Sequence, residues 1–285
     1  MRWACLLLFL TLPFAEATAG VLLLPKTALQ PHEIALIINQ TDPLSRAIGA
    51  YYRQRRAIPA ANVIRVRFDA RPHLAVDTFK QIYRQVLAQT PAHVQAYALA
   101  WARPYRVGCQ TITTAFATGY DPHYCGDRLP KRPCSITGAS AYFNSGSRRP
   151  YDDHGLRPSM LLAAATIEEA KRLIDRGIAA DGTFPTGTAY LLSTSDKART
   201  VRDRGFARIE AVLGERIAIE VYAQDHLQGK DDVLFYFTGR IRVDYLDSLR
   251  FLPGAVGDHL TSAGGKMARK GVGKQMSALR WLEAG

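Results

Sequence analysis

The chain contains 285 residues, of which 47% are hydrophobic and 22% are charged, a composition that indicates a globular protein and excludes a disordered or collagen-like chain. Its 37 lysine and arginine residues outnumber the 25 acidic residues and give a net charge of +12. This balance favours acidic partners such as phosphate-bearing lipids, polyanionic glycans or nucleic acid, although a solvated arginine-rich surface is the simpler explanation. Because no nucleic-acid-binding motif accompanies the charge, we expect no specific nucleic-acid partner.

The N-terminus has the pattern of a secretory signal peptide. Within residues 1–19, Arg2 supplies the positive start, residues 4–14 are apolar, and residues 17–19 read Ala-Thr-Ala, a small-residue cleavage pattern. We therefore expect a periplasmic or secreted protein that begins near Gly20. No later stretch reaches the about 18 to 20 apolar residues that a membrane-spanning helix needs, so we expect no transmembrane segment after the signal is removed.

Strands and helices alternate in the first hundred residues of the expected mature chain. Short runs rich in branched apolar residues predict strands, and apolar residues at helical spacing predict helices. The expected elements are a strand at 33–39, a helix from Pro43 to before Pro59, a strand at 63–68, a helix that carries residues 79–87, and a strand at 94–101. Two successive strand-helix-strand units imply a parallel sheet with right-handed crossovers.

Residues 103–157 interrupt this alternation and predict an irregular cover over the sheet. The segment holds the three cysteines that follow the signal peptide, namely Cys109, Cys125 and Cys134. The stretch between Cys125 and Cys134 contains a glycine and two prolines, which favours a local disulfide between these two cysteines in an oxidising compartment. Cys109 then remains either as a small buried side chain or as a reactive thiol.

Alternation resumes after this cover. A capping box at 166–169 begins a helix, and the further expected elements are a strand at 189–192, a basic helix after Asp196, strands at 217–222 and 233–238, and an amphipathic segment at 275–283. We expect residues 20–285 to form a single three-layer α/β domain of caspase-like or flavodoxin-like type, with a mainly parallel sheet between helices and an irregular cysteine-containing insertion. The sequence contains no visible internal repeat.

The stretch at 251–265, FLPGAVGDHLTSAGG, follows the strongest predicted strand and gathers an acid, an imidazole and hydroxyls between glycines. It predicts either the wall of a pocket or a capped turn. A catalytic triad of Asp258, His259 and Ser262 is disfavoured, because groups this close along a chain rarely adopt the serine-histidine-acid relay.

Candidate binding residues follow the predicted strands. In open parallel sheets, ligands bind beyond the carboxyl ends of the strands, where loops and helix N-termini converge. On this rule one candidate pocket is expected to contain Asp42, Arg103, Arg106, Thr194, Asp196, Thr238, Arg240, Asp258, His259 and Ser262. Capping of a helix N-terminus is the simpler role for Asp42 and Asp196.

Several catalytic motifs are missing from the sequence. It contains no G-x-S-x-G elbow, no complete phosphate-binding loop, no H-E-x-x-H and no paired C-x-x-C. We therefore predict no metal site and no cofactor, and the motifs leave open whether the protein is an enzyme.

Four blocks of the sequence, at residues 37–63, 157–199, 233–265 and 275–285, carry a resemblance to a known family. Together they resemble an uncharacterised family of exported bacterial proteins from genomes that carry the exosortase/PEP-CTERM sorting system. The resemblance implies an exported envelope protein that serves as a binding or accessory factor of that system. Its partner would be another protein or an acidic glycan or lipid. The family pattern continues past Gly285, which implies that a last strand and helix are missing here.

The first strand-helix-strand block is also distantly similar to gingipain-type and caspase-like cysteine peptidases. That resemblance implies an alternative function as a cysteine hydrolase, with Cys109 or a residue beyond Gly285 as the nucleophile. The pattern requires a histidine-glycine pair after a strand, but Arg240 stands there, and no cysteine follows Cys134. A polyanion-binding module is the third hypothesis.

Overall fold

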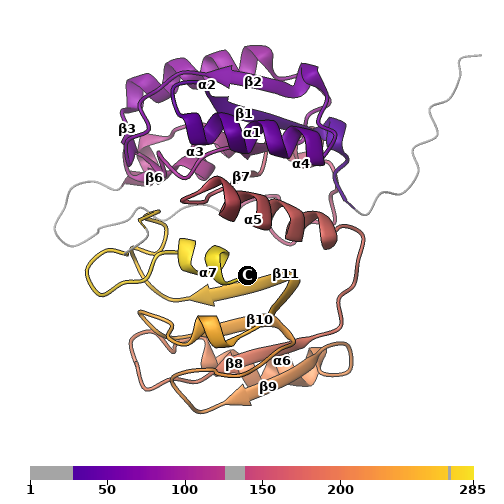
Figure 1. The fold of residues 1–285 in the computed structure, drawn as a ribbon, viewed down its shortest axis with the longest axis vertical. Coiled ribbons are helices and arrows are strands. Elements are labelled where there is room, and N and C mark those ends of the chain that lie inside the picture. Colours follow the sequence, from indigo (N-terminus) through magenta and orange to yellow (C-terminus); the bar gives the residue numbers. More distant parts are fainter. Residues whose placement is uncertain (1–27, 126–138, 269–270) are drawn as a thin grey trace, which may run out of the picture.

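The structure is a computed structural model that describes residues 28–125, 139–268 and 271–285 (Figure 1). The predicted signal peptide and Cys134 lie outside these residues. In chain order the elements are β1 (Ile34–Asn39), α1 (Pro43–Arg55), β2 (Val63–Val66), β3 (His73–Leu74), α2 (Val76–Gln89), β4 (Ala96–Leu99), β5 (Arg106–Val107), β6 (Gln110–Thr111), α3 (Ile112–Thr118), α4 (Pro150–His154), β7 (Ser159–Leu161), α5 (Ile167–Ala179), β8 (Thr188–Leu192), α6 (Phe206–Leu213), β9 (Ala218–Tyr222), β10 (Val233–Thr238), β11 (Phe251–His259) and α7 (Leu279–Ala284).

The first half of the chain builds a four-stranded sheet in the order β2-β1-β4-β7, and every neighbouring pair in it is parallel. The central strand β1 is apolar on both faces, which is the pattern of a strand buried from both sides. Helices accordingly cover both faces. Apolar side chains of α2 and α3 pack on one face, and those of α1 and α5 pack on the other.

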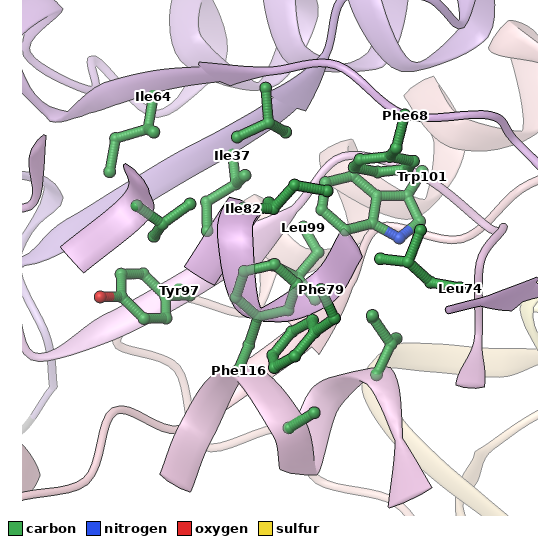
Figure 2. Close-up of a cluster of buried hydrophobic side chains, with 14 of the residues drawn as sticks. Ile37, Ile64, Phe68, Leu74, Phe79, Ile82, Tyr97, Leu99, Trp101 and Phe116 are labelled. Atoms are coloured by element: carbon green, nitrogen blue, oxygen red, sulfur yellow. The ribbon is translucent and has the colours of Figure 1, made fainter. Parts of the chain in front are cut away.

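Aromatic side chains fill the core between this sheet and α2 and α3 (Figure 2). The ring of Phe116 lies edge-on to Phe79, with centroids 5.2 Å apart, and the Trp101 and Tyr97 rings pack around it. Edge-to-face ring pairs of this kind add about 0.5–1.5 kcal/mol each beyond the area that they bury. The core therefore fixes α3 and the segment at Trp101 that follows β4, from which the chain continues to Arg103.

The second half builds another four-stranded parallel sheet, in the order β11-β10-β8-β9. One face packs against α7, where Tyr236 meets the Trp281 ring edge-on at 5.3 Å. The opposite face is covered by the eight-residue helix α6. The strand order repeats that of the first sheet, because in each half the first strand lies between the second and the third and the fourth takes the edge. The sequence shows no sign of this repeated topology.

Helix α5 joins the two halves (Figure 1). It packs on α1 of the first half and contacts β11 and α7 of the second. Two carboxylate contacts fasten α1 to α5, since Tyr51 Oη and Arg55 Nε both donate to Asp175, at 2.8 Å to its nearer oxygen in each case. The predicted parallel α/β class with helices on both faces is confirmed. The division of its strands between two sheets is a feature that the strand pattern alone does not reveal.

Three segments have more regular structure than predicted. Residues 251–259 form strand β11, which pairs with β10 through a register irregularity between Val233 and Phe235. The predicted pocket wall lies on this strand, since residues within 251–257 line a cavity of about 420 Å³ together with α5 and α7. Its glycines and proline hide the strand pattern, since these residues are poor strand formers. The expected irregular cover contains α3 and the short α4, and strand β7 follows it at Ser159–Leu161.

The sequence-based prediction paired Cys125 with the wrong cysteine. Cys125 is bonded to Cys109, with Cα atoms 5.2 Å apart, and not to Cys134. The reason is that β5 and β6 form a tight antiparallel hairpin, which turns Cys109 back toward the 3₁₀ turn at Pro122–Cys125. A disulfide is compatible with an oxidising compartment.

Candidate functional site

The strand order defines where a ligand site is expected in each sheet. The chain leaves β1 toward β2 on one side and returns to β4 on the other, so the carboxyl ends of β1 and β4 flank a topological switch point. Loops on opposite sides of such a point diverge and leave a crevice between them. In the second sheet, β8 and β10 flank the equivalent point. The predicted pocket residues other than Arg106 therefore divide between these two sheets instead of sharing one edge.

A crevice of about 260 Å³ is present at the first switch point. Asp42, which follows β1, and Arg103, which follows β4, supply its charged side chains. Four alanines, Ala70, Ala102, Ala164 and Ala165, form much of the wall, and their small side chains leave the space open. Leu44, Met267 and Leu279 complete the lining. The two halves of the molecule thus meet at this crevice, because Met267 and Leu279 belong to the second.

A buried asparagine holds the β1 side of the crevice in place. Asn39 is fully buried, and its amide donates to the Phe68 carbonyl while its oxygen accepts from the Phe68 N–H, at 2.9 and 3.2 Å. Its backbone N–H donates to Ser45 Oγ at 2.9 Å. These bonds tie the end of β1 to the residues after β2 and to the first turn of α1. The turn that presents Asp42 is therefore rigid.

Asp42 is the N-cap of α1 and accepts from the Leu44 N–H through Oδ1 at 3.0 Å. The predicted capping role is confirmed. Capping uses one carboxylate oxygen, and Asp42 still lines the crevice. Pro43 at the first helical position has no N–H that would need a partner.

Arg103 is exposed and lies across the crevice from Asp42 without an ion pair between them. Its Nε donates to the Met267 carbonyl at 3.3 Å. The loop before it is held from inside, since Trp101 Nε1 donates to the Pro104 carbonyl at 3.1 Å. Among the described residues, the two terminal guanidinium nitrogens of Arg103 have no hydrogen-bond partner. They can therefore bind a ligand carboxylate or phosphate in a bidentate manner.

The second switch point is closed by polar contacts within the protein. Asp225 accepts from the Ser195 backbone and hydroxyl, both at 2.7 Å, and from Arg240 at 2.9 Å. Hydrogen bonds from Ser195, with a smaller contribution from the charge of Arg240, lower the pKa of Asp225. A Cβ on Gly239 would lie 2.5 Å from the Thr200 backbone, so the neighbouring loop leaves no room there. This edge is packed, whereas the first is open.

The other predicted residues of this edge differ in their surroundings. Asp196 pairs with Arg199 at 2.9 Å, and Asp258 pairs with Arg202. Thr194 and Thr238 are buried, with 3% and 5% of their surfaces exposed, and their hydroxyls have no hydrogen-bond partner among the described residues. Arg106 lies elsewhere, in β5, where its Nε donates to the Gly108 carbonyl.

His259 is held as a neutral side chain inside the second half. Trp281 Nε1 donates to Nδ1 at 2.9 Å, which leaves the proton on Nε2, 3.2 Å from the Met276 carbonyl that accepts it. Burial lowers the pKa of His259, and the bond to Met276 offsets this only in part. Ser262 contacts Gln275 at 3.3 Å rather than the imidazole. Both ring nitrogens are thus occupied, so Asp258, His259 and Ser262 do not form a triad.

The structure also bears on the cysteine nucleophile. Cys109 Sγ is bonded to Cys125, so it carries no thiolate in the oxidised protein.

In the described part of the chain, no three His, Cys, Asp or Glu side chains gather as metal ligands would. Within the same ranges, no helix has both the length and the apolar character needed to cross a bilayer.

Strand-end reasoning finds Asp42 and Arg103 but misses the rest of the crevice. Alanine side chains do not indicate a binding site in a sequence, and Met267 and Leu279 reach the site only through packing between the halves.

No protein-family model, no curated protein and no solved structure matches the chain. What is defined is thus a class of fold, an α/β protein with two parallel sheets of the same strand order.

Proposed function

We propose that the protein is an exported envelope factor that binds an acidic glycan at the crevice between β1 and β4. The observation that carries this proposal is Arg103, whose terminal guanidinium nitrogens have no described partner at a topological switch point. In keeping with the resemblance of its sequence blocks, we assign the protein to the exosortase/PEP-CTERM sorting machinery as a binding or accessory component.

The chemistry of the crevice favours a sugar that carries a carboxylate. The Arg103 guanidinium matches a carboxylate with two parallel hydrogen bonds. Across the crevice, Asp42 can accept from a ligand hydroxyl, because capping of α1 occupies only its Oδ1. The space of about 260 Å³ is below the range of about 300–1,000 Å³ for drug-sized ligands. One sugar unit of a longer chain is therefore the appropriate occupant, and the net charge of +12 attracts the remaining units.

Calorimetry with an oligogalacturonate and with its neutral methyl ester tests this proposal. Arg103→Ala is expected to weaken binding of the acidic sugar by about 10- to 100-fold, as expected for loss of hydrogen bonds between charged groups at about 1.5–3 kcal/mol. Arg84→Ala is the matched control. Arg84 is an exposed arginine on α2, so this substitution removes the same charge at a position away from the crevice.

If Arg103→Ala and Arg84→Ala weakened glycan binding equally, the affinity would depend only on the net charge of the protein. That result would reject the crevice as the site and favour a general polyanion-binding module. Equal affinity for the acidic and methylated sugars would reject recognition of the carboxylate.

A further inference from the structure

A second cavity lies in the other half of the molecule, between α6 and the open face of the second sheet. Its volume is about 470 Å³. On the helix side it is lined by Phe206, Ile209 and Leu213, which recur at helical spacing on one face of α6. On the sheet side it is lined by side chains that include Leu191 of β8 and Phe235 and Phe237 of β10.

Incomplete cover creates this cavity. β10 is an inner strand, between β8 and β11, yet Phe235 and Phe237 are only half-buried, whereas Tyr236 on the opposite face is fully buried. Within residues 139–268, neither the β9–β10 nor the β10–β11 connection contains an α-helix, so α6 is left to cover the face. The cavity opens to solvent, so its apolar walls form a contiguous exposed apolar surface. Such surfaces are typical of ligand-binding grooves and interaction sites.

The lining of the cavity indicates the chemistry of its ligand. Among the described residues, Arg202 is the one charged residue in the lining, and the remaining lining side chains are aliphatic or aromatic. An apolar cavity of roughly 150 Å³ already takes up apolar molecules instead of water. The arginine adds a site for an anion at the border of the apolar space. Such a combination fits a molecule with one long apolar chain and one acidic head.

Charge around the cavity supports the same ligand. Arg202 pairs with Asp258 of β11 through Nη1, but its side chain remains 46% exposed, so its other guanidinium nitrogens can donate to a ligand carboxylate while this pair is kept. Arg204 and Arg208 follow within the next six residues, are exposed, and have no ion-pair partner among the described residues. Val201 and Val212, which are 46% and 65% exposed, extend the apolar surface near the same helix.

We propose that the cavity beneath α6 binds a single-chain amphiphile with an acidic head, of the fatty-acid class, with its chain against Phe235 and Phe237 and its carboxylate at Arg202. This site is separate from the glycan crevice and does not depend on it. The two sites use different sheets, so loss of one is expected to leave the other intact.

Displacement of cis-parinaric acid, a fatty acid whose fluorescence rises in apolar surroundings, tests the proposal on the delipidated protein. Oleate is expected to displace the probe at micromolar concentration. Ile209→Trp, at the partly exposed border, and Ala189→Phe, inside the cavity, are expected to reduce probe binding at least 10-fold. Circular dichroism verifies that each variant is folded, and two positions are used so that one misfolded variant does not decide the result.

The head group is tested by Arg202→Gln, with Arg216→Gln as the matched control, because Arg216 is exposed and does not line the cavity. Arg202→Gln is expected to weaken oleate about 10-fold and to leave oleyl alcohol unchanged, whereas Arg216→Gln alters neither. Absence of oleate binding, or binding that both filling variants leave unchanged while folded, would overturn the proposal. So would a dimer in sedimentation that Ile209→Trp dissociates, because the face would then bind a second copy.

Discussion

At the scale of single residues, burial and local partners decide what each polar side chain does. Asp258, His259 and Ser262 stand within five positions of the sequence, yet each has a different structural partner: Arg202, Trp281 and Gln275. Arg103 has no such partner for its terminal nitrogens among the described residues. Guanidinium nitrogens without a partner therefore indicate a binding group more directly than residue type does.

Neutral His259 makes stability depend on pH. Its folded-state pKa is lowered by burial, so the unfolded chain takes up the proton first as pH falls. Its contribution is therefore present above the ordinary histidine pKa, about 6.5, and is lost as pH falls from there through the lowered folded value. We expect the urea midpoint to fall between pH 7 and pH 5, and to fall less in His259→Gln.

His123→Gln is the control for this pH series, since the His123 side chain is 92% exposed. It is expected to keep the pH response of the natural protein. A His259→Gln variant with an unchanged pH response would show that the imidazole titrates alike in the folded and unfolded states.

At the scale of elements, a strand or helix can be predicted from the sequence when its own residues favour that structure. The β1 and β10 regions are runs of branched and aromatic residues, and both strands were predicted almost to their ends. β11 was not, because Pro253, Gly254 and Gly257 are poor strand formers and only pairing with β10 makes the segment extended. The repeated strand order likewise depends on tertiary contacts that no local pattern encodes.

Gly257 in β11 provides a direct test of that tertiary packing. A Cβ at this position would lie 2.4 Å from the Trp281 ring, which is 8% exposed and cannot easily move. Gly257→Ala is therefore expected to lower the free energy of unfolding by about 1–3 kcal/mol, the cost of overpacking a core. Gly205→Ala is the control, since no atom of the described residues lies within 4 Å of its added Cβ and its φ of −95° suits alanine. Equal stability of the two variants in chemical denaturation would contradict the packing of α7 on β11.

At the scale of the whole molecule, two parallel sheets meet through α5 and the segment that carries Met267 and Leu279 (Figure 1). The rule of strand ends located Asp42 and Arg103 because it depends only on strand order within the first sheet. It failed to separate them from Thr194 and Arg240, because one main sheet had been expected where the described residues form two four-stranded parallel sheets. No sequence pattern predicted the cavity beneath α6, because only the packing of the elements determines which part of the sheet face stays uncovered.

The Cys109–Cys125 disulfide stabilises the first half of the molecule and is compatible with an oxidising compartment. It closes a loop with a sequence separation of 16, for which loop-closure entropy predicts a stabilisation of about 3 kcal/mol. Cys109→Ser, Cys125→Ser and the double variant are expected to lose similar stability in denaturant, because all three remove the same bond. Cys134→Ser is the control and should leave stability unchanged. Non-reducing peptide mapping should recover Cys109 linked to Cys125, and a peptide linking Cys125 to Cys134 would contradict the structure.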